Sequence, residues 1–266
     1  MRLRLGTVLL AGASLVFPAI LPAEAVSVRH AEGLVHGFLS LRTLDGETLA
    51  VGDLIQTTKG NRVTSRLVFH FRDGSIHDET VVFSQRRTFR LVSDRLIQKG
   101  PAFPVPIDVS VDGRSGQVTV RYKDDDGQEK VASERLEVPP DLSNGMILTL
   151  LKNIRPNAAR TTISMVAAAP KPRMVTLIIT PAGEEPFSVG GSPRKAMHYV
   201  VKVEIGGVAG LVAPLIGKQP ADSHVWILGG EAPAFVRSEG PLAMDGPIWR
   251  IELASPVWPA AADAKP

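Results

Sequence analysis

The sequence predicts a mainly β protein: a large curved antiparallel sheet, an open barrel or half-barrel, with one covering α-helix. Turn signals such as Asp-Gly recur at short, even spacing, and the segments between them alternate in polarity. Strands joined by short turns must pair antiparallel, because a parallel crossover needs about a dozen residues or more. So many strands in one chain usually curl to limit exposed edges. A two-sheet sandwich is the alternative.

The first 25 residues have the pattern of a secretory signal peptide. A basic start at Met1–Arg4 precedes an uncharged apolar run over 5–21, and small residues follow at Ala23 and Ala25. A single membrane anchor is the alternative, but the apolar run is near the minimum span and contains glycine and proline. We expect cleavage after Ala25 and a periplasmic or extracellular protein.

The composition excludes several classes of protein. Hydrophobic residues make up 44% and charged residues 21% of the 266 residues, which excludes a disordered chain and a polytopic membrane protein. The net charge of +3 is too small to indicate a nucleic-acid partner. The chain has no cysteine, which excludes disulfides, thiolate metal sites and a lipid-anchored lipoprotein.

One segment has apolar residues at helical spacing, and we expect a helix over 144–155. The preceding residues Asp141, Ser143 and Asn144 are candidate caps, and Pro156 stops the helix. The apolar stripe needs a sheet face to cover. No linker separates the strands on either side of it, so we expect a single domain over 26–258 and a disordered tail over 259–266.

The hairpin at Asp73-Gly74 offers a candidate metal site. With a two-residue loop, His70 lies across from His77 and shares a face with Glu79. Two imidazoles and a carboxylate could hold zinc and a water molecule, as in a metal-dependent hydrolase. The alternative is a solvated face with Arg66 beside Glu79, and a register shift of one residue would separate the histidines. We therefore expect no metal and no cofactor.

Other segments resemble known binding or catalytic motifs but lack the residues that those motifs require. The acids of Asp124–Asp126 are consecutive, which suits a charged hairpin tip and not a calcium loop. Gly217-Lys218 lacks the glycine and Ser/Thr of a phosphate loop. The sequence contains no Gly-x-Ser-x-Gly elbow and no His-Glu-x-x-His pair. We expect no catalytic residues and favour a protein that is not an enzyme.

Each of two further segments allows two interpretations. Arg86–Arg90 is strongly basic for a strand and could contact anionic lipid or polysaccharide, or could protect an exposed edge strand by charge. Ile205–Gly217 has no charge and is too short to span a membrane. It is either a buried hairpin or a mobile apolar flap over a cavity or against a bilayer.

A curved sheet crossed by a helix makes a concave apolar cavity, which is a common ligand site. We expect the ligand between the helix and the concave face, with 205–217 near its mouth. The expected ligand-binding residues are Phe69, Phe71, Met146, Leu150, Leu211, Leu215, Trp226 and Trp249.

The chain resembles a group of exported bacterial β-proteins of unknown function. The resemblance covers Val63–Leu253 and depends on three features: Pro139–Gly145 before the single helix, His224–Ile227, and Gly246–Leu253. It implies a curved antiparallel sheet similar to lipoprotein-carrier and lipocalin-like half-barrels, in which the late strands close the sheet. The resemblance implies no catalytic residues for this chain.

The sequence therefore favours a non-catalytic binding module for an apolar or lipid-like ligand, with peripheral membrane contact. One alternative is a metal-dependent hydrolase using His70, His77 and Glu79. The other is a structural envelope protein that binds other proteins through its basic strands.

The signal-peptide pattern predicts the mature N-terminus. N-terminal sequencing of exported protein should read from Val26, because a peptidase recognises the small residues at Ala23 and Ala25. Exported protein that retains Met1 would contradict this prediction.

Overall fold

The computed structural model describes residues 25–124, 126–189, 192–205 and 220–254. These residues form an open sheet of 14 antiparallel strands and one short helix, α1 (Ile147–Asn153). The predicted mainly β class is confirmed. The strands are β1 (Val35–Arg42), β2 (Thr48–Lys59), β3 (Arg62–Phe71), β4 (Ile76–Gln85), β5 (Phe89–Lys99), β6 (Ile107–Asp112), β7 (Gln117–Lys123), β8 (Glu129–Arg135), β9 (Thr161–Ala167), β10 (Arg173–Val189), β11 (Ser192–Glu204), β12 (Ser223–Leu228), β13 (Ala234–Pro241) and β14 (Ile248–Leu253).

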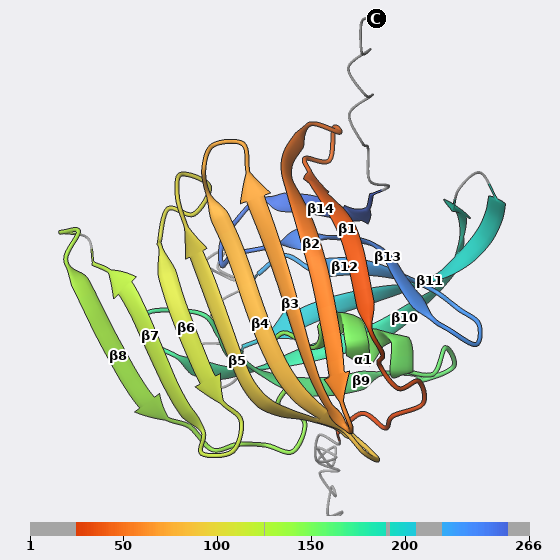
Figure 1. The fold of residues 1–266 in the computed structure, drawn as a ribbon, viewed down its shortest axis with the longest axis horizontal. Coiled ribbons are helices and arrows are strands. Elements are labelled where there is room, and N and C mark those ends of the chain that lie inside the picture. The colour runs from red at the N-terminus through yellow and green to blue at the C-terminus, as the bar shows by residue number, and fades with distance from the viewer. Residues whose placement is uncertain (1–24, 125, 190–191, 206–219, 255–266) are drawn as a thin grey trace, which may run out of the picture.

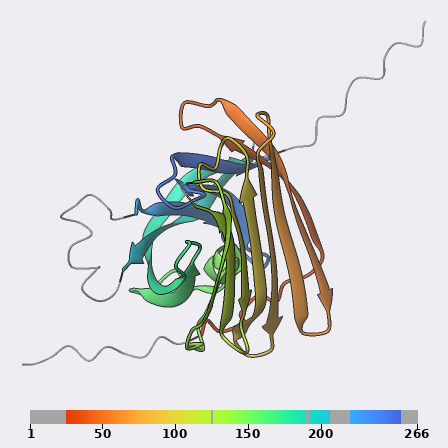
Figure 2. The ribbon, with the colours of Figure 1, turned by 90° about the vertical axis from the view of Figure 1, so that its left-hand side faces the viewer.

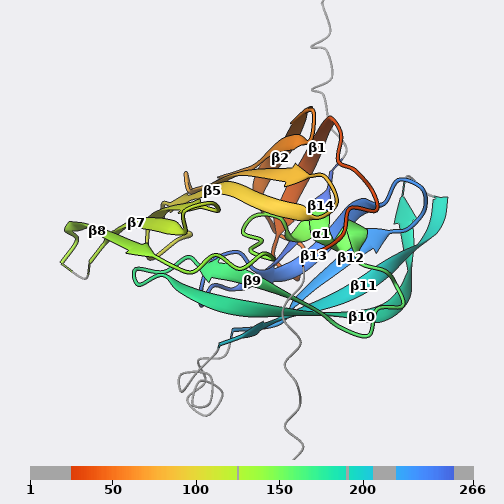
Figure 3. The same ribbon diagram turned by 90° about the horizontal axis from the view of Figure 1, so that it is seen from below.

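The sheet consists of two runs of neighbouring strands joined by one pairing. β1 to β8 follow one another in chain order, as do β9 to β14, and β1 pairs with β14 to join the runs. The late strands therefore lie near the middle of the sheet, and β8 and β9 are its edges. The sheet curves so that β2–β8 and β9–β13 lie on opposite sides of α1 (Figures 1 and 3).

The helix lies between the two sides of the sheet (Figure 2), and apolar side chains from both sides pack around it. Met146, Leu150 and Leu151 are each 1% exposed and belong to one core cluster. This cluster also contains Phe69 and Phe83 from one side of the sheet, and Ile163 and Tyr199 from the other. Alternation along the strands predicts which of these residues face inward.

The residues before α1 do not cap it as the sequence suggests. The helix spans Ile147–Asn153, shorter than expected, and its N-cap Met146 makes no side-chain capping bond. The side chain of Asn144 instead accepts from the amide of Val166 and donates to its carbonyl, both at 2.9 Å. Asp141 accepts a hydrogen bond from Ser164. The predicted caps are wrong, because the side chains of Asn144 and Asp141 form hydrogen bonds with residues of the edge strand β9 and not with the first turn of the helix.

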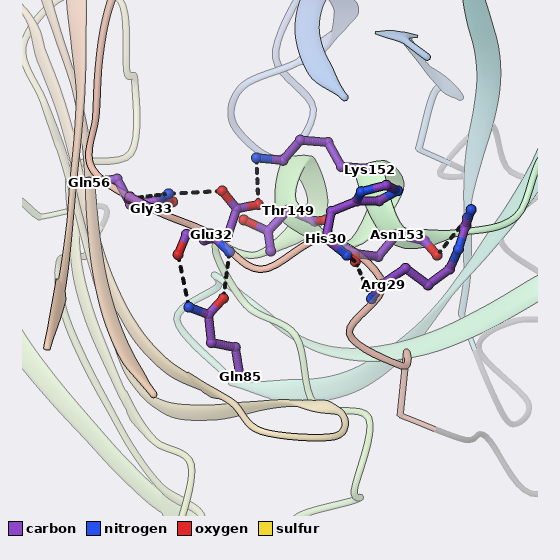
Figure 4. A network of polar contacts seen from close by, with 9 residues as sticks. All are labelled: Arg29, His30, Glu32, Gly33, Gln56, Gln85, Thr149, Lys152 and Asn153. Carbon is purple, nitrogen blue, oxygen red and sulfur yellow. Dashed lines mark hydrogen bonds and ion pairs between the residues drawn. The ribbon is translucent and has the colours of Figure 1, made fainter. Parts of the chain in front are cut away.

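A buried ion pair ties α1 to the N-terminal segment and to the sheet (Figure 4). Lys152 lies 2.5 Å from the carboxylate of Glu32, and their side chains are 17% and 6% exposed. The second oxygen of Glu32 accepts from Gln56 of β2 at 2.9 Å. Gln85 of β4 accepts from the Glu32 amide and donates to its carbonyl. Asn153 accepts from two backbone amides, at 29 and 30.

Several sequence-based expectations lie outside the described residues: the signal peptide over 1–24, most of the apolar segment 205–217, and the tail over 259–266. Among the residues that are described, no helix is long and apolar enough to cross a membrane.

The ion pair predicts an asymmetric response to mutation. Glu32→Gln should lower the free energy of unfolding by about 3 kcal/mol or more, because the Lys152 ammonium is left buried without a countercharge. Adding Lys152→Met should restore most of the loss. Urea denaturation measures both effects.

Arg95→Gln is the matched control, because the Arg95–Asp108 pair is more exposed and should contribute less than about 1 kcal/mol. If Glu32→Gln costs no more than this control, the ion pair does not hold the helix.

Candidate functional site

The structure places the residues expected to bind ligand mainly in the packed core. Five of them are at most 9% exposed and belong to one cluster. These are Phe69, Phe71, Met146, Leu150 and Trp249. Trp226 belongs to a separate small cluster with Ala196 and Val236. Leu211 and Leu215 lie outside the described residues.

The proposed metal set is separated by the strand register. Phe69, not His70, pairs with His77, and Leu67 pairs with Glu79. His70 therefore lies on the exposed outer face, whereas His77 is 3% exposed on the inner face. Arg66 pairs with Asp78 and not with Glu79. The predicted grouping of His70, His77 and Glu79 is wrong.

The turn explains the different register. The amide of Phe71 donates to the carbonyl of Ser75, so the loop holds three residues instead of two. Gly74 has a φ of 84°, which is the left-handed residue of a three-residue hairpin. One added loop residue moves every later side chain to the opposite face.

Two carboxyl groups on the inner face of the sheet meet the chain just before α1. A Cβ atom at Gly145 would lie 3.1 Å from Oδ1 of Asp94 and 3.4 Å from the carboxyl carbon of Glu79. Burial raises the pKa of Glu79 to about 7. Burial, followed by the charge of Glu79, raises the pKa of Asp94 well above its usual value. Both carboxyl groups therefore keep a proton to higher pH than an ordinary carboxyl group does.

His77 lies on the same inner face, two residues from Glu79, and burial lowers its pKa to about 4. Its Nδ1 contacts the side-chain amide of Gln98 at 3.1 Å. A neutral imidazole beside protonated carboxyls keeps this part of the core uncharged.

A groove of about 670 Å³ lies at the rim of the sheet. The hairpins that follow β2, β4 and β6 lie at the same end of the strands, and the connection from β8 to α1 runs along that end (Figure 1). Five of the lining side chains are cationic, and apolar residues of β5 and of the connection complete the wall. The cations are Lys59, Arg62, Arg86, Arg90 and Arg114.

The strand register gathers these cations. Lys59 pairs with Arg62, Arg62 with Ser84, and Ser84 with Arg90. Directly opposite side chains on neighbouring antiparallel strands lie about 5 Å apart. Three of the five cations, Lys59, Arg62 and Arg90, therefore lie in one row on the outer face, with Ser84 of β4 between the two arginines.

The lining of the groove supplies no countercharge, and Asp112, which interacts electrostatically with Arg114, lies outside that lining. The lining contains no carboxylate. None of its five cations forms an ion pair with any acidic side chain of the described residues. Arg90 donates from Nη1 to the carbonyl of Pro140 at 2.6 Å, which attaches the apolar wall to the row of cations. The arrangement suits an anionic ligand.

Protection of an edge strand does not explain the arginines. β5 pairs with β4 on one side and β6 on the other, far from the edges β8 and β9. That interpretation of Arg86–Arg90 is wrong.

Sequence reasoning identified the arginines at 86 and 90 but missed Lys59, Arg62 and Arg114. The sequence contained a pattern that could have identified them, because these three residues flank the predicted turns at 60–61 and 113. In an antiparallel meander every second turn lies at the same end of the strands, so basic residues at alternate turns lie close together.

Comparisons with known proteins give little beyond the fold. No family model matches the chain, and no curated protein matches it. The crystal structure of a beta-barrel-like protein of the domain of unknown function DUF1849, from Brucella abortus, is similar to this chain with a TM-score of 0.48 and 9% sequence identity. The match covers 84% of this chain and 98% of that chain.

The acid pair predicts that stability falls as the pH rises through neutrality. Carboxyls with raised pKa values bind protons more tightly when folded, so the free energy of unfolding decreases as pH rises toward the folded pKa. His77 opposes this effect between about pH 4 and 6.5, so the clear window is pH 6.5 to 8. Glu79 alone should cost roughly 1 kcal/mol across that window.

Glu79→Gln should flatten this slope and raise stability at pH 8, as measured by urea denaturation at each pH. Asp78→Asn is the matched control, because Asp78 pairs with Arg66 and its pKa is lowered by that hydrogen bond. A slope that is the same in Glu79→Gln and wild type would show that Glu79 does not carry the proton.

Proposed function

We propose that the protein is a non-catalytic binding module of the bacterial envelope that holds a lipid-like anion in the rim groove. The observation that carries this proposal is the set of five cations without ion-pair partners around one groove. Like charges that are gathered without a countercharge destabilise the fold by their mutual repulsion. A bound anion removes that cost.

The chemistry of the groove favours a phosphate or carboxylate head group. Four of the five cations are arginines, whose planar guanidinium groups donate two parallel hydrogen bonds to such anions. Their positions on three separate hairpins allow them to approach one head group from different sides. Binding of this kind weakens as the salt concentration rises.

The apolar part of the lining supports an amphiphile over a bare anion. Val138 and Pro139 are half-buried and lie beside the cations, and the buried core residues Leu91 and Leu142 form the floor beneath them. The interior of the sheet is filled by α1 and the core cluster, so the rim groove accommodates an acyl chain better than the packed interior does. The predicted ligand-binding residues of the core then shape the protein and do not contact the ligand.

The signal-peptide pattern supports an envelope location, where anionic lipids are abundant. A metal-dependent hydrolase using His70, His77 and Glu79 loses its support, because His70 lies on the opposite face of the sheet. A structural role in binding other proteins would use the same basic surface, and the experiment below separates it from lipid binding.

Isothermal titration of the mature protein with dodecyl phosphate tests the proposal. Arg62→Gln and Arg86→Gln should each weaken binding about tenfold, because each removes a charged hydrogen bond. Arg121→Gln is the control, since Arg121 is an exposed cation outside the groove lining.

Two further ligands identify what the groove recognises. Inorganic phosphate should bind more weakly than dodecyl phosphate, and dodecyl maltoside should not bind. Equal affinity for inorganic phosphate would reduce the site to an anion site without lipid selectivity. No binding of either phosphate would reject the proposal and leave protein binding as the role of the basic surface.

A further inference from the structure

A second cluster lies on the outer face of the other side of the sheet. His198 of β11 and His224 of β12 face each other diagonally across the strands, with Nε2 of His198 2.9 Å from Nδ1 of His224. Nδ1 of His198 lies 2.9 Å from Glu185 of β10. The indole of Trp226 donates to the other oxygen of Glu185 at 2.8 Å. Nothing in the rim groove depends on this cluster.

From these contacts we propose that His198 and His224 form a binding site for one borderline divalent metal ion, such as Zn²⁺, Ni²⁺ or Cu²⁺. Imidazole nitrogen is a preferred ligand of these ions. In a tetrahedral site with bonds of about 2.0–2.1 Å, two nitrogen ligands lie about 3.3 Å apart. Metal binding replaces the hydrogen bond between the two rings: the proton on Nδ1 of His224 moves to its Nε2, and the rings separate by a few tenths of an ångström and turn so that both lone pairs point at the ion.

Glu185 prepares His198 for this role. A carboxylate on Nδ1 fixes the proton there, so the lone pair of Nε2 points toward His224. This is the outer-sphere arrangement found at histidine-bound metals, in which a carboxylate orients the ring and raises its basicity. Trp226 stacks on His198 with ring centroids 4.6 Å apart and holds Glu185 in place.

The surrounding charges also favour a cation. Glu239 lies opposite His224 on β13 but is engaged by Arg250 at 2.8 Å. Arg237 is paired with Glu252 at 2.9 Å. Each of these pairs is neutral. The guanidinium of Arg237 lies 5.7 Å from the centroid of the Trp226 ring, and its ion pair is with Glu252 and not with Glu185. No group of three or more histidine and acidic side chains in the described residues is arranged to hold a metal, so water completes the coordination of a two-histidine site.

Calorimetric titration of the mature, tag-free protein with ZnCl₂, and separately with CuCl₂, tests the proposal. One ion should bind per chain. His224→Gln and His198→Gln should each weaken binding at least tenfold, because each removes one of two protein ligands. Glu185→Gln keeps both ligands and should weaken binding about tenfold to a hundredfold, as expected for an outer-sphere partner.

His36→Gln and His70→Gln are matched controls, because both histidines are exposed and lie elsewhere on the sheet. They should bind as wild type does. Cu²⁺ should also quench the fluorescence of Trp226 in wild type, and this quenching should be absent in His224→Gln, whose fold can be verified by circular dichroism.

Absence of binding to wild type at 1:1 stoichiometry would overturn the proposal. So would binding that both His198→Gln and His224→Gln retain. Because the variants lie outside the rim groove, they should leave dodecyl phosphate binding unchanged, and the two proposals can fail separately.

Discussion

The ion pair between Glu32 and Lys152 connects the parts of this molecule that the chain itself keeps apart. The sheet is open, and in the described residues its two runs of strands pair with each other only where β1 meets β14. The helix lies between those two runs, and Lys152 fixes it to an N-terminal segment that is bound in turn to β2 and β4. Two charges removed from water are stable only together. The position of α1, and hence of the core around it, depends on that pairing.

The same helix explains how a half-barrel can lack a large internal ligand cavity in its packed region. Leu150 and Leu151 fill the space that an open curved sheet would otherwise present to a ligand. The segment before the helix has two further roles. Asn144 satisfies the backbone of the edge strand β9, and Pro140 accepts a hydrogen bond from Arg90 at the rim groove.

The two proposed sites lie on different sides of the sheet and use different chemistry. The rim groove gathers cations from alternate turns, whereas the histidine cluster gathers imidazoles from neighbouring strands. Both are built on the outer face, where side chains are not needed for the core. An antiparallel sheet with one packed and one solvated face leaves alternate residues free for such sites.

The sequence by itself determined the class of fold, the inward faces of many strands and the presence of one helix, because alternation and helical spacing are local properties of the chain. Two of the five cations of the rim groove, Arg86 and Arg90, were also recognisable in the sequence. The tertiary structure alone decided which residues meet. A single extra loop residue at Gly74 separated His70 from His77, and the contact between His198 and His224 depends on the register of two strands separated by the segment 205–222. Such contacts arise from pairings between distant segments, which no local pattern encodes.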